Sequence, residues 1–121
     1  MSLFSSLRTG RSRKSADEVH VSEKGGIRSL HLGSDTVQSS MRIAAPFELA
    51  LSYTRAMMGF LLFHPAPRQF LMIGLGGGSL AKYVWHRLPE ARTTVIENNE
   101  RIIAAARSQF ALPANDERLH V

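Results

Sequence analysis

The residues with the clearest potential for chemistry are a run of glycines and an acidic residue that follows it. The run is Gly74-Leu75-Gly76-Gly77-Gly78, and Glu97 lies 23 residues after Gly74. Glycine permits a tight turn and lets a ligand approach the backbone closely, because it has no side chain. A carboxylate at the tip of the next strand can accept hydrogen bonds from both hydroxyl groups of a ribose. The spacing is close to the roughly 20 residues of nucleotide-binding units, so it predicts a nucleoside site.

The pattern of the glycines bears on which nucleotide is bound. The dinucleotide fingerprint is G-x-G-x-x-G, and here Gly74 and Gly76 fit it while Ser79 occupies the last place. The pattern Gly74-x-Gly76-x-Gly78 is more typical of S-adenosyl methionine loops. A nicotinamide-binding Rossmann protein is therefore a further alternative, which Ser79 disfavours.

The segments around the loop predict the elements that would position it. Leu80, Val84 and Leu88 recur four apart, as on one face of a helix, and Pro89 ends that pattern. The expected elements are a strand at 69–73, a helix at 79–88, a strand at 93–96, a helix at 100–110 and a strand at 119–121. The order β-α-β-α-β predicts an α/β fold with a parallel sheet. It corresponds to the first half of a Rossmann-like domain of the S-adenosyl methionine-dependent methyltransferase type.

A small β-hairpin unit is expected ahead of this domain. Residues 18–22 and 27–32 alternate apolar and polar side chains on either side of Gly25-Gly26, which is a turn signal. Residues 36–41 predict a third short strand. The expected organisation is a disordered basic tail at 1–17, the β unit at 18–42 and the partial nucleotide-binding domain at 43–121.

A helix is expected after Pro46, with Leu49, Tyr53, Met57 and Phe60 on one buried face. The surrounding segment, residues 47–63, is strongly apolar but contains two charged residues. A membrane-spanning helix needs roughly 20 apolar residues and rarely contains charges. The segment therefore predicts a helix of a soluble protein and no membrane partner.

The net charge of +5 and the isoelectric point of about 10.4 raise the question of nucleic acid binding. Much of the excess lies in the first residues, where Arg8, Arg11, Arg13 and Lys14 precede the first acid, Asp17. Such a segment is typical of a solvated tail, with an anion-binding or targeting role as its alternative. Nucleic acid is thus a disfavoured partner. The chain has no cysteine, which fits a reducing, cytoplasmic location, and its five histidines lack metal-ligand spacing.

With these parts in order, residues 19–121 resemble the N-terminal part of the spermidine synthase family. Members combine a small β-rich domain, a helix with a tyrosine, and a Rossmann-like domain whose loop reads I-G-G-G-D-G-G before a strand ending V-E-I-D. The corresponding residues here are Ile73-Gly74-Leu75-Gly76-Gly77-Gly78-Ser79 and Val95-Ile96-Glu97-Asn98. The segment Pro46-Phe47-Glu48-Leu49-Ala50-Leu51-Ser52-Tyr53 resembles the bacterial spermidine synthase-like branch.

The resemblance implies roles for six residues. Gly74, Gly76 and Gly78 would line the thioadenosine site, Glu97 would hold the ribose, and Gln38 would reach the nucleoside. Tyr53 matches the family's helix tyrosine beside the amine site, although an aromatic residue on an apolar face is equally well explained as part of the core. No catalytic residue is assigned, because the family's amine-deprotonating aspartate belongs to a later strand.

Two departures bear on the substrate. The aspartate of the family loop is Gly77 here, and the family's Y-H-E is Tyr53-Thr54-Arg55. A diamine is dicationic and favours carboxylates, so both changes argue against ordinary putrescine binding.

The sequence thus predicts a spermidine synthase-like transferase of polyamine biosynthesis, incomplete and inactive as this fragment. Its small-molecule partners would be an S-adenosyl nucleoside and an amine. The nucleoside would be decarboxylated S-adenosyl methionine for aminopropyl transfer or S-adenosyl methionine for methyl transfer, with no metal. The alternative is a non-catalytic binding or oligomerisation module, in which an exposed sheet edge supports a homodimer.

Overall fold

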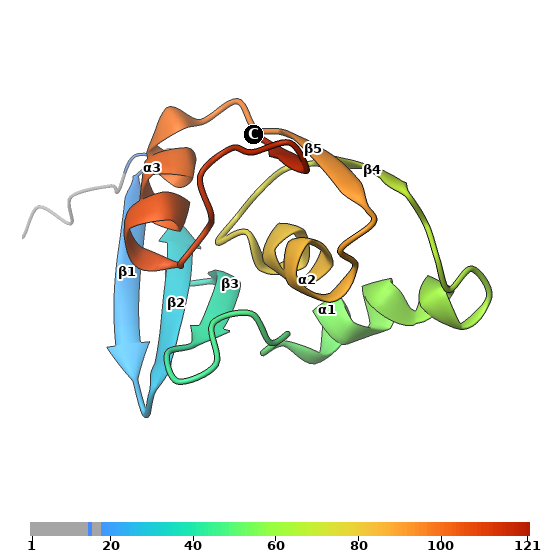
Figure 1. Ribbon diagram of the computed structural model, residues 1–121. Helices are drawn as coiled ribbons and strands as arrows, with labels where there is room; N and C mark the ends of the chain where they lie inside the picture. Colours follow the sequence, from blue (N-terminus) through green and yellow to red (C-terminus); the bar gives the residue numbers. More distant parts are fainter. Residues whose placement is uncertain (1–14, 16–17) are drawn as a thin grey trace, which may run out of the picture.

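The protein is described by a computed structural model, which covers Ser15 and residues 18–121. The expected basic tail lies outside the described residues except for Ser15. In chain order, the elements are β1 (Val19–Lys24), β2 (Ile27–Leu32), β3 (Val37–Arg42), α1 (Ser52–Met57), the 3-10 helix η1 (Met58–Leu62), β4 (Gln69–Ile73), α2 (Ser79–Arg87), β5 (Arg92–Ile96), α3 (Glu100–Gln109) and β6 (Leu119–His120) (Figure 1).

Strands β1, β2 and β3 form an antiparallel sheet in that order. Gly25 and Gly26, at the turn between β1 and β2, have φ values of 58° and 75°. A two-residue hairpin turn of this kind requires positive φ at both central residues, which glycine adopts without strain. The three strands expected from the alternating pattern are therefore present.

Strands β4, β5 and β6 form a second, parallel sheet in that order. Helices α2 and α3 pack against one of its faces, where Ala81 and Ala106 meet Val95 and Leu119 in a buried cluster. On the strands, the alternate residues Leu71, Ile73 and Ile96 are exposed. The expected α/β arrangement is confirmed, and each of its five predicted elements lies within two residues of the expected position.

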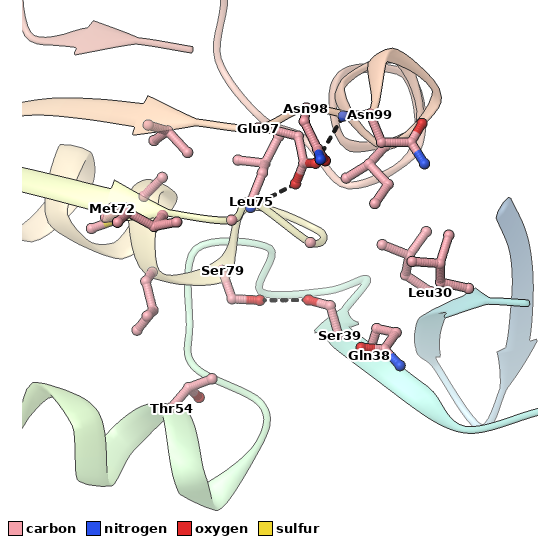
Figure 2. Close-up of a pocket in the computed structure, with 18 of the residues that line it drawn as sticks. Leu30, Gln38, Ser39, Thr54, Met72, Leu75, Ser79, Glu97, Asn98 and Asn99 are labelled. Carbon is pink, nitrogen blue, oxygen red and sulfur yellow. Dashed lines mark hydrogen bonds between the residues drawn. The ribbon is translucent and has the colours of Figure 1, made fainter. Parts of the chain in front are cut away.

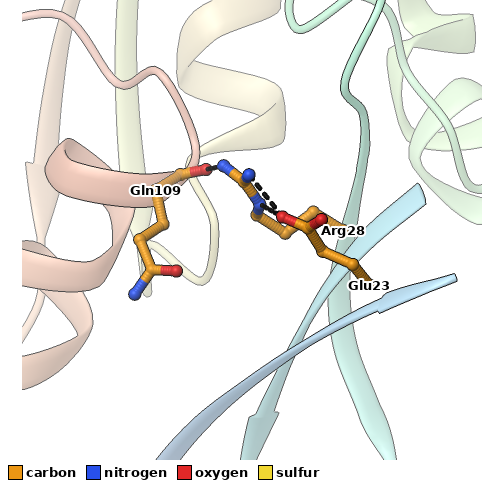
Figure 3. Close-up of polar contacts among 3 residues, drawn as sticks. All are labelled: Glu23, Arg28 and Gln109. Atoms are coloured by element: carbon orange, nitrogen blue, oxygen red, sulfur yellow. Dashed lines mark hydrogen bonds and ion pairs between the residues drawn. The ribbon is translucent and has the colours of Figure 1, made fainter. Parts of the chain in front are cut away.

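The two sheets are joined through α3. Leu30 and Met41 of the first sheet share a buried cluster with Ala105 and Phe110 at the end of α3. Arg28 on β2 adds a polar link, because its Nη1 donates to the Gln109 carbonyl over 2.5 Å while its guanidinium pairs with Glu23 (Figure 3). A cation near the last carbonyls of a helix is favourable. The first sheet is therefore fixed beside the loops that follow β4 and β5.

The helix expected after Pro46 differs from the prediction. Helix α1 begins only at Ser52 and continues as the 3-10 helix η1. Tyr53, Met57 and Phe60 are 53%, 54% and 39% exposed, so the predicted buried face is wrong. The buried residues are Leu49, Thr54 and Met58. Because α1 begins only at Ser52, Leu49 lies outside the helix and does not set its buried face; Tyr53 and Met57 line a cavity instead of the core.

No helix in the described part of the chain is both long and apolar enough to cross a bilayer.

Candidate functional site

The glycine loop between β4 and α2 lies beside the end of β5, and Glu97 joins the two. The Gly74 N–H continues the sheet by donating to the Ile96 carbonyl over 2.8 Å. Glu97 then accepts from the Leu75 N–H through Oε2 (3.0 Å) and from the Asn99 N–H through Oε1 (2.9 Å) (Figure 2). The carboxylate is therefore held rigidly, and each oxygen retains a lone pair for a further donor.

Three loop glycines have left-handed backbones that other residues rarely adopt. The φ values are 88° at Gly74, 57° at Gly76 and 75° at Gly78. Gly78 is also crowded, because a Cβ atom there would lie 2.9 Å from Leu112 Cδ1. The requirement for glycine at Gly78 therefore has a structural cause, the left-handed start of α2 against Leu112.

A cavity of about 1210 Å³ lies in front of the loop, between the two sheets. Five of the six residues predicted for the site line it, and they come from β3, α1 and the two loops that follow β4 and β5. These five are Gln38, Tyr53, Gly74, Gly76 and Glu97. Gly78 is buried and is not among the lining residues, so its predicted contact with a ligand has no support in the geometry.

The opposite wall of the cavity comes from β3 and α1. Ser39 Oγ lies 3.1 Å from Ser79 Oγ, which connects β3 with the first residue of α2 (Figure 2). The Tyr53 hydroxyl donates to the Gln38 carbonyl over 3.2 Å, which connects α1 with β3. This wall of the cavity is therefore held in place by contacts between segments far apart in the sequence.

Charges gather at one end of the cavity. Of the described residues that line it, the carboxylates are Glu97 and Glu100, and the one cationic side chain is Arg101. All three come from the end of β5 and the start of α3. Asn99 caps α3 there, because its side chain accepts from the Arg101 N–H over 3.0 Å. The wall formed by Ser39 and Ser79 is uncharged.

Sequence reasoning missed several residues of this cavity. Asn98 and Asn99 directly follow Glu97, so their position at a strand end could have indicated them. In the sequence, Ser79 stands out only because it departs from the dinucleotide fingerprint. Thr54 has a signal only through its place in the Y-H-E comparison. For Ser39 and Met57 the sequence holds no signal, because only the packing of β3 and α1 beside the loop brings them to the cavity.

The crowding at Gly78 gives a prediction about stability. Gly78→Ala is expected to lower the free energy of unfolding by about 2 kcal/mol, through backbone strain and the collision with Leu112. Gly59→Ala is the matched control, because a Cβ there meets nothing within 4 Å and the backbone is not left-handed. Urea denaturation of both variants measures the difference, and equal values would contradict the assigned strain.

Comparison with known proteins identifies relatives of the chain. No family model matches the chain. The chain is 54% identical over 105 residues to a polyamine aminopropyltransferase of Neisseria meningitidis, a match that covers 86% of this chain and 40% of the relative. It is 54% identical over 96 residues to a polyamine aminopropyltransferase of Chromobacterium violaceum, covering 79% of this chain and 37% of the relative. The chain thus spans about two fifths of the length of these relatives.

Two solved structures share the fold. A probable spermidine synthase from Corynebacterium glutamicum aligns with a TM-score of 0.69 at 18% identity, over 84% of this chain and 39% of that protein. Human methyltransferase-like protein 13, solved in complex with SAH, aligns with a TM-score of 0.53 at 25% identity, over 60% of this chain and 35% of that protein. The resemblance predicted from the sequence is confirmed: the chain is spermidine synthase-like and corresponds to a part of a polyamine aminopropyltransferase relative.

Proposed function

We propose that this chain forms the nucleoside-binding side of the site in a spermidine synthase-like transferase. Its ligand would be an S-adenosyl nucleoside, with the ribose hydroxyls donating to Glu97 and the thioadenosine lying along Gly74 and Gly76. The observation that carries the proposal is the fixed Glu97 carboxylate, which lines a large cavity together with those two glycines.

The relatives support the proposal from two directions. The bacterial relatives are named polyamine aminopropyltransferases, and the human structural neighbour was solved with SAH. The reaction proposed for the full-length protein is alkyl transfer. A nucleophile attacks the carbon next to the sulfonium, the C–S bond breaks to leave a thioether, and the nucleophile loses its proton to a base. Within this chain, the proposed contribution is binding and orienting the nucleoside.

Calorimetry with methylthioadenosine tests the proposal. Methylthioadenosine has the ribose and the thioether but no charged tail, so its binding reports the nucleoside pocket alone. We expect saturable binding by residues 1–121, no binding of a nicotinamide dinucleotide at the same concentrations, and no aminopropyl transfer by this chain alone. Binding of the dinucleotide without methylthioadenosine would favour the nicotinamide alternative.

The binding-module alternative predicts a different result. Under this alternative the chain would bind no S-adenosyl ligand. It would instead bind an oligonucleotide through its basic residues, with an affinity that falls steeply as the salt concentration increases. The titration should therefore be repeated with a duplex oligonucleotide at two salt concentrations.

A further inference from the structure

A second cavity lies between the helical segment α1–η1 and the end of α2, and it is here called the arginine groove. Its volume is about 570 Å³, which is within the range of small-molecule sites. Tyr53 and Met57 line the large cavity, whereas Arg55 and Met58 line the groove, and none of the described residues lines both. The groove is therefore distinct from the site proposed for the nucleoside. The residues that give it its chemistry are Arg42, Glu48, Leu49, Arg55, Met58 and Arg87.

The arginine groove carries an excess of positive charge. Its cationic residues are Arg42 at the end of β3, Arg55 on α1 and Arg87 at the end of α2. The acidic residue of the lining is Glu48, which forms no ion pair with these arginines in the described part of the chain. Arg55 Nη2 donates to the Ala50 carbonyl over 3.4 Å, which uses one of the five N–H groups of its guanidinium. Most of the N–H donors in the groove therefore remain for a ligand.

Apolar side chains line the groove together with the arginines. Leu49 and Met58 are only 9% and 8% exposed and belong to one buried cluster, on which Leu61 and Tyr83 also pack. A guanidinium group can bind a carboxylate or a phosphate through two parallel hydrogen bonds. Apolar surface is stabilised when it is removed from water. A ligand that fits both parts of the groove therefore has an anionic group joined to an apolar body.

The excess positive charge selects among the possible occupants of the groove. Residues 1–14 hold four cationic side chains and no acidic one, so the groove would repel them. A second copy in a two-fold contact would present the same surface, so the two sets of arginines would oppose each other. We propose that the arginine groove binds a small amphiphilic anion, with a carboxylate or phosphate at the guanidinium groups and an apolar body against Leu49 and Met58. This inference does not depend on the proposed nucleoside site.

Calorimetry on the 121-residue chain tests the groove with decanoate and decyl phosphate, both kept below the concentration at which they form micelles. Saturable binding is expected, and the tighter of the two anions identifies the preferred head group. Decanoate should bind at least about 10-fold more tightly than hexanoate, because its longer chain buries more apolar surface. Decyltrimethylammonium has the same chain and the opposite charge, so it should not bind at the same concentrations. Equal affinities for the cation and the anions, or no saturable binding of either anion, would overturn the inference.

Two double variants locate the binding on the protein. Arg55→Gln/Arg87→Gln removes two cations of the groove and should weaken the binding of decanoate by about 10-fold, as expected for two partly solvated ion pairs. Arg68→Gln/Arg92→Gln is the matched control, because both arginines are exposed and neither lines the groove. Circular dichroism checks that both double variants fold. Equal affinities of the two variants for decanoate would contradict the assignment of the anion to the groove.

Two other occupants of the groove give different results. A concentration-dependent dimer in analytical ultracentrifugation, abolished in Arg55→Gln/Arg87→Gln, would show that a second copy fills the groove. A peptide of alternating leucine and glutamate that bound while both decyl anions did not would assign the groove to a segment of a partner protein. Either result would exclude the small amphiphilic anion as the occupant.

Discussion

Glu97→Ala is expected to lower the affinity for methylthioadenosine by about 100-fold and the free energy of unfolding by about 3 kcal/mol. The loss of affinity and the loss of stability both follow from removal of the Glu97 carboxylate. The carboxylate accepts from the Leu75 N–H and the Asn99 N–H, so its removal leaves two backbone donors without their partner. It also removes the acceptor proposed for the ribose hydroxyls.

The two effects can be separated with a second variant. Glu97→Gln keeps one side-chain oxygen and the length of the side chain, so it should lose less stability than Glu97→Ala while still binding the ligand poorly. Glu90→Ala, at an exposed acid between α2 and β5, is the control for loss of one negative charge. Calorimetry gives the affinity and urea denaturation gives the stability. If folded Glu97→Ala bound methylthioadenosine with unchanged affinity, Glu97 would not be the acceptor for the ribose hydroxyls. If its free energy of unfolding were unchanged, the hydrogen bonds from the Leu75 and Asn99 N–H groups would not stabilise the fold.

Lys82 is a lysine of α2 whose side chain is buried. Lys82 is 1% exposed, and its Nζ donates to the Phe110 carbonyl at the end of α3 over 2.6 Å. Burial lowers the pKa of Lys82 from 10.5 to about 8, because the charged ammonium loses its contact with water. The contact joins α2 to the end of α3 at Phe110, whose ring also crowds Gly77.

The lowered pKa makes the stability depend on pH in a defined window. Between about pH 8 and 10.5 the unfolded chain holds the Lys82 proton and the folded chain does not, so the free energy of unfolding rises as pH increases. The full change amounts to about 3 kcal/mol. Below pH 8 both states are protonated, and the cost of burying the charge is fully present.

Lys82→Met removes this titration and keeps an unbranched side chain of similar length. The difference in unfolding free energy, wild type minus Lys82→Met, should therefore become more positive from pH 8 to 10.5 and stay constant below pH 7. Lys24→Met is the control, because Lys24 is an exposed lysine on β1. Urea denaturation across this pH range gives the values. Parallel pH profiles for wild type and Lys82→Met would show that Lys82 keeps an ordinary pKa when folded.

Local sequence signals determined the elements of the α/β part. The predicted bounds of β4 and α2 agree nearly with those observed. For β4 the signal is the apolar run Gln69–Ile73, and for α2 it is the four-residue spacing of Leu80 and Val84 with Pro89 after the helix. These signals succeed because strand and helix periodicity reflect contact with one shared core. The same signals fail at Tyr53 and Met57, which line the cavity instead of the core. Helical periodicity identifies which residues share a face of a helix, but it does not tell whether that face packs against the core or lines a cavity.

The sequence by itself also placed Glu97 at the end of a strand and gave the glycines their spacing. Which other residues lie beside them depends on how the two sheets pack together. Ser39 lies 40 residues from Ser79 along the chain, and the two hydroxyls come within 3.1 Å because the first sheet docks on α3 through Leu30, Met41 and Phe110. That docking also fills the space over Gly77. The charge and shape of the cavity wall arise from contacts between distant segments, which no local pattern of residues records.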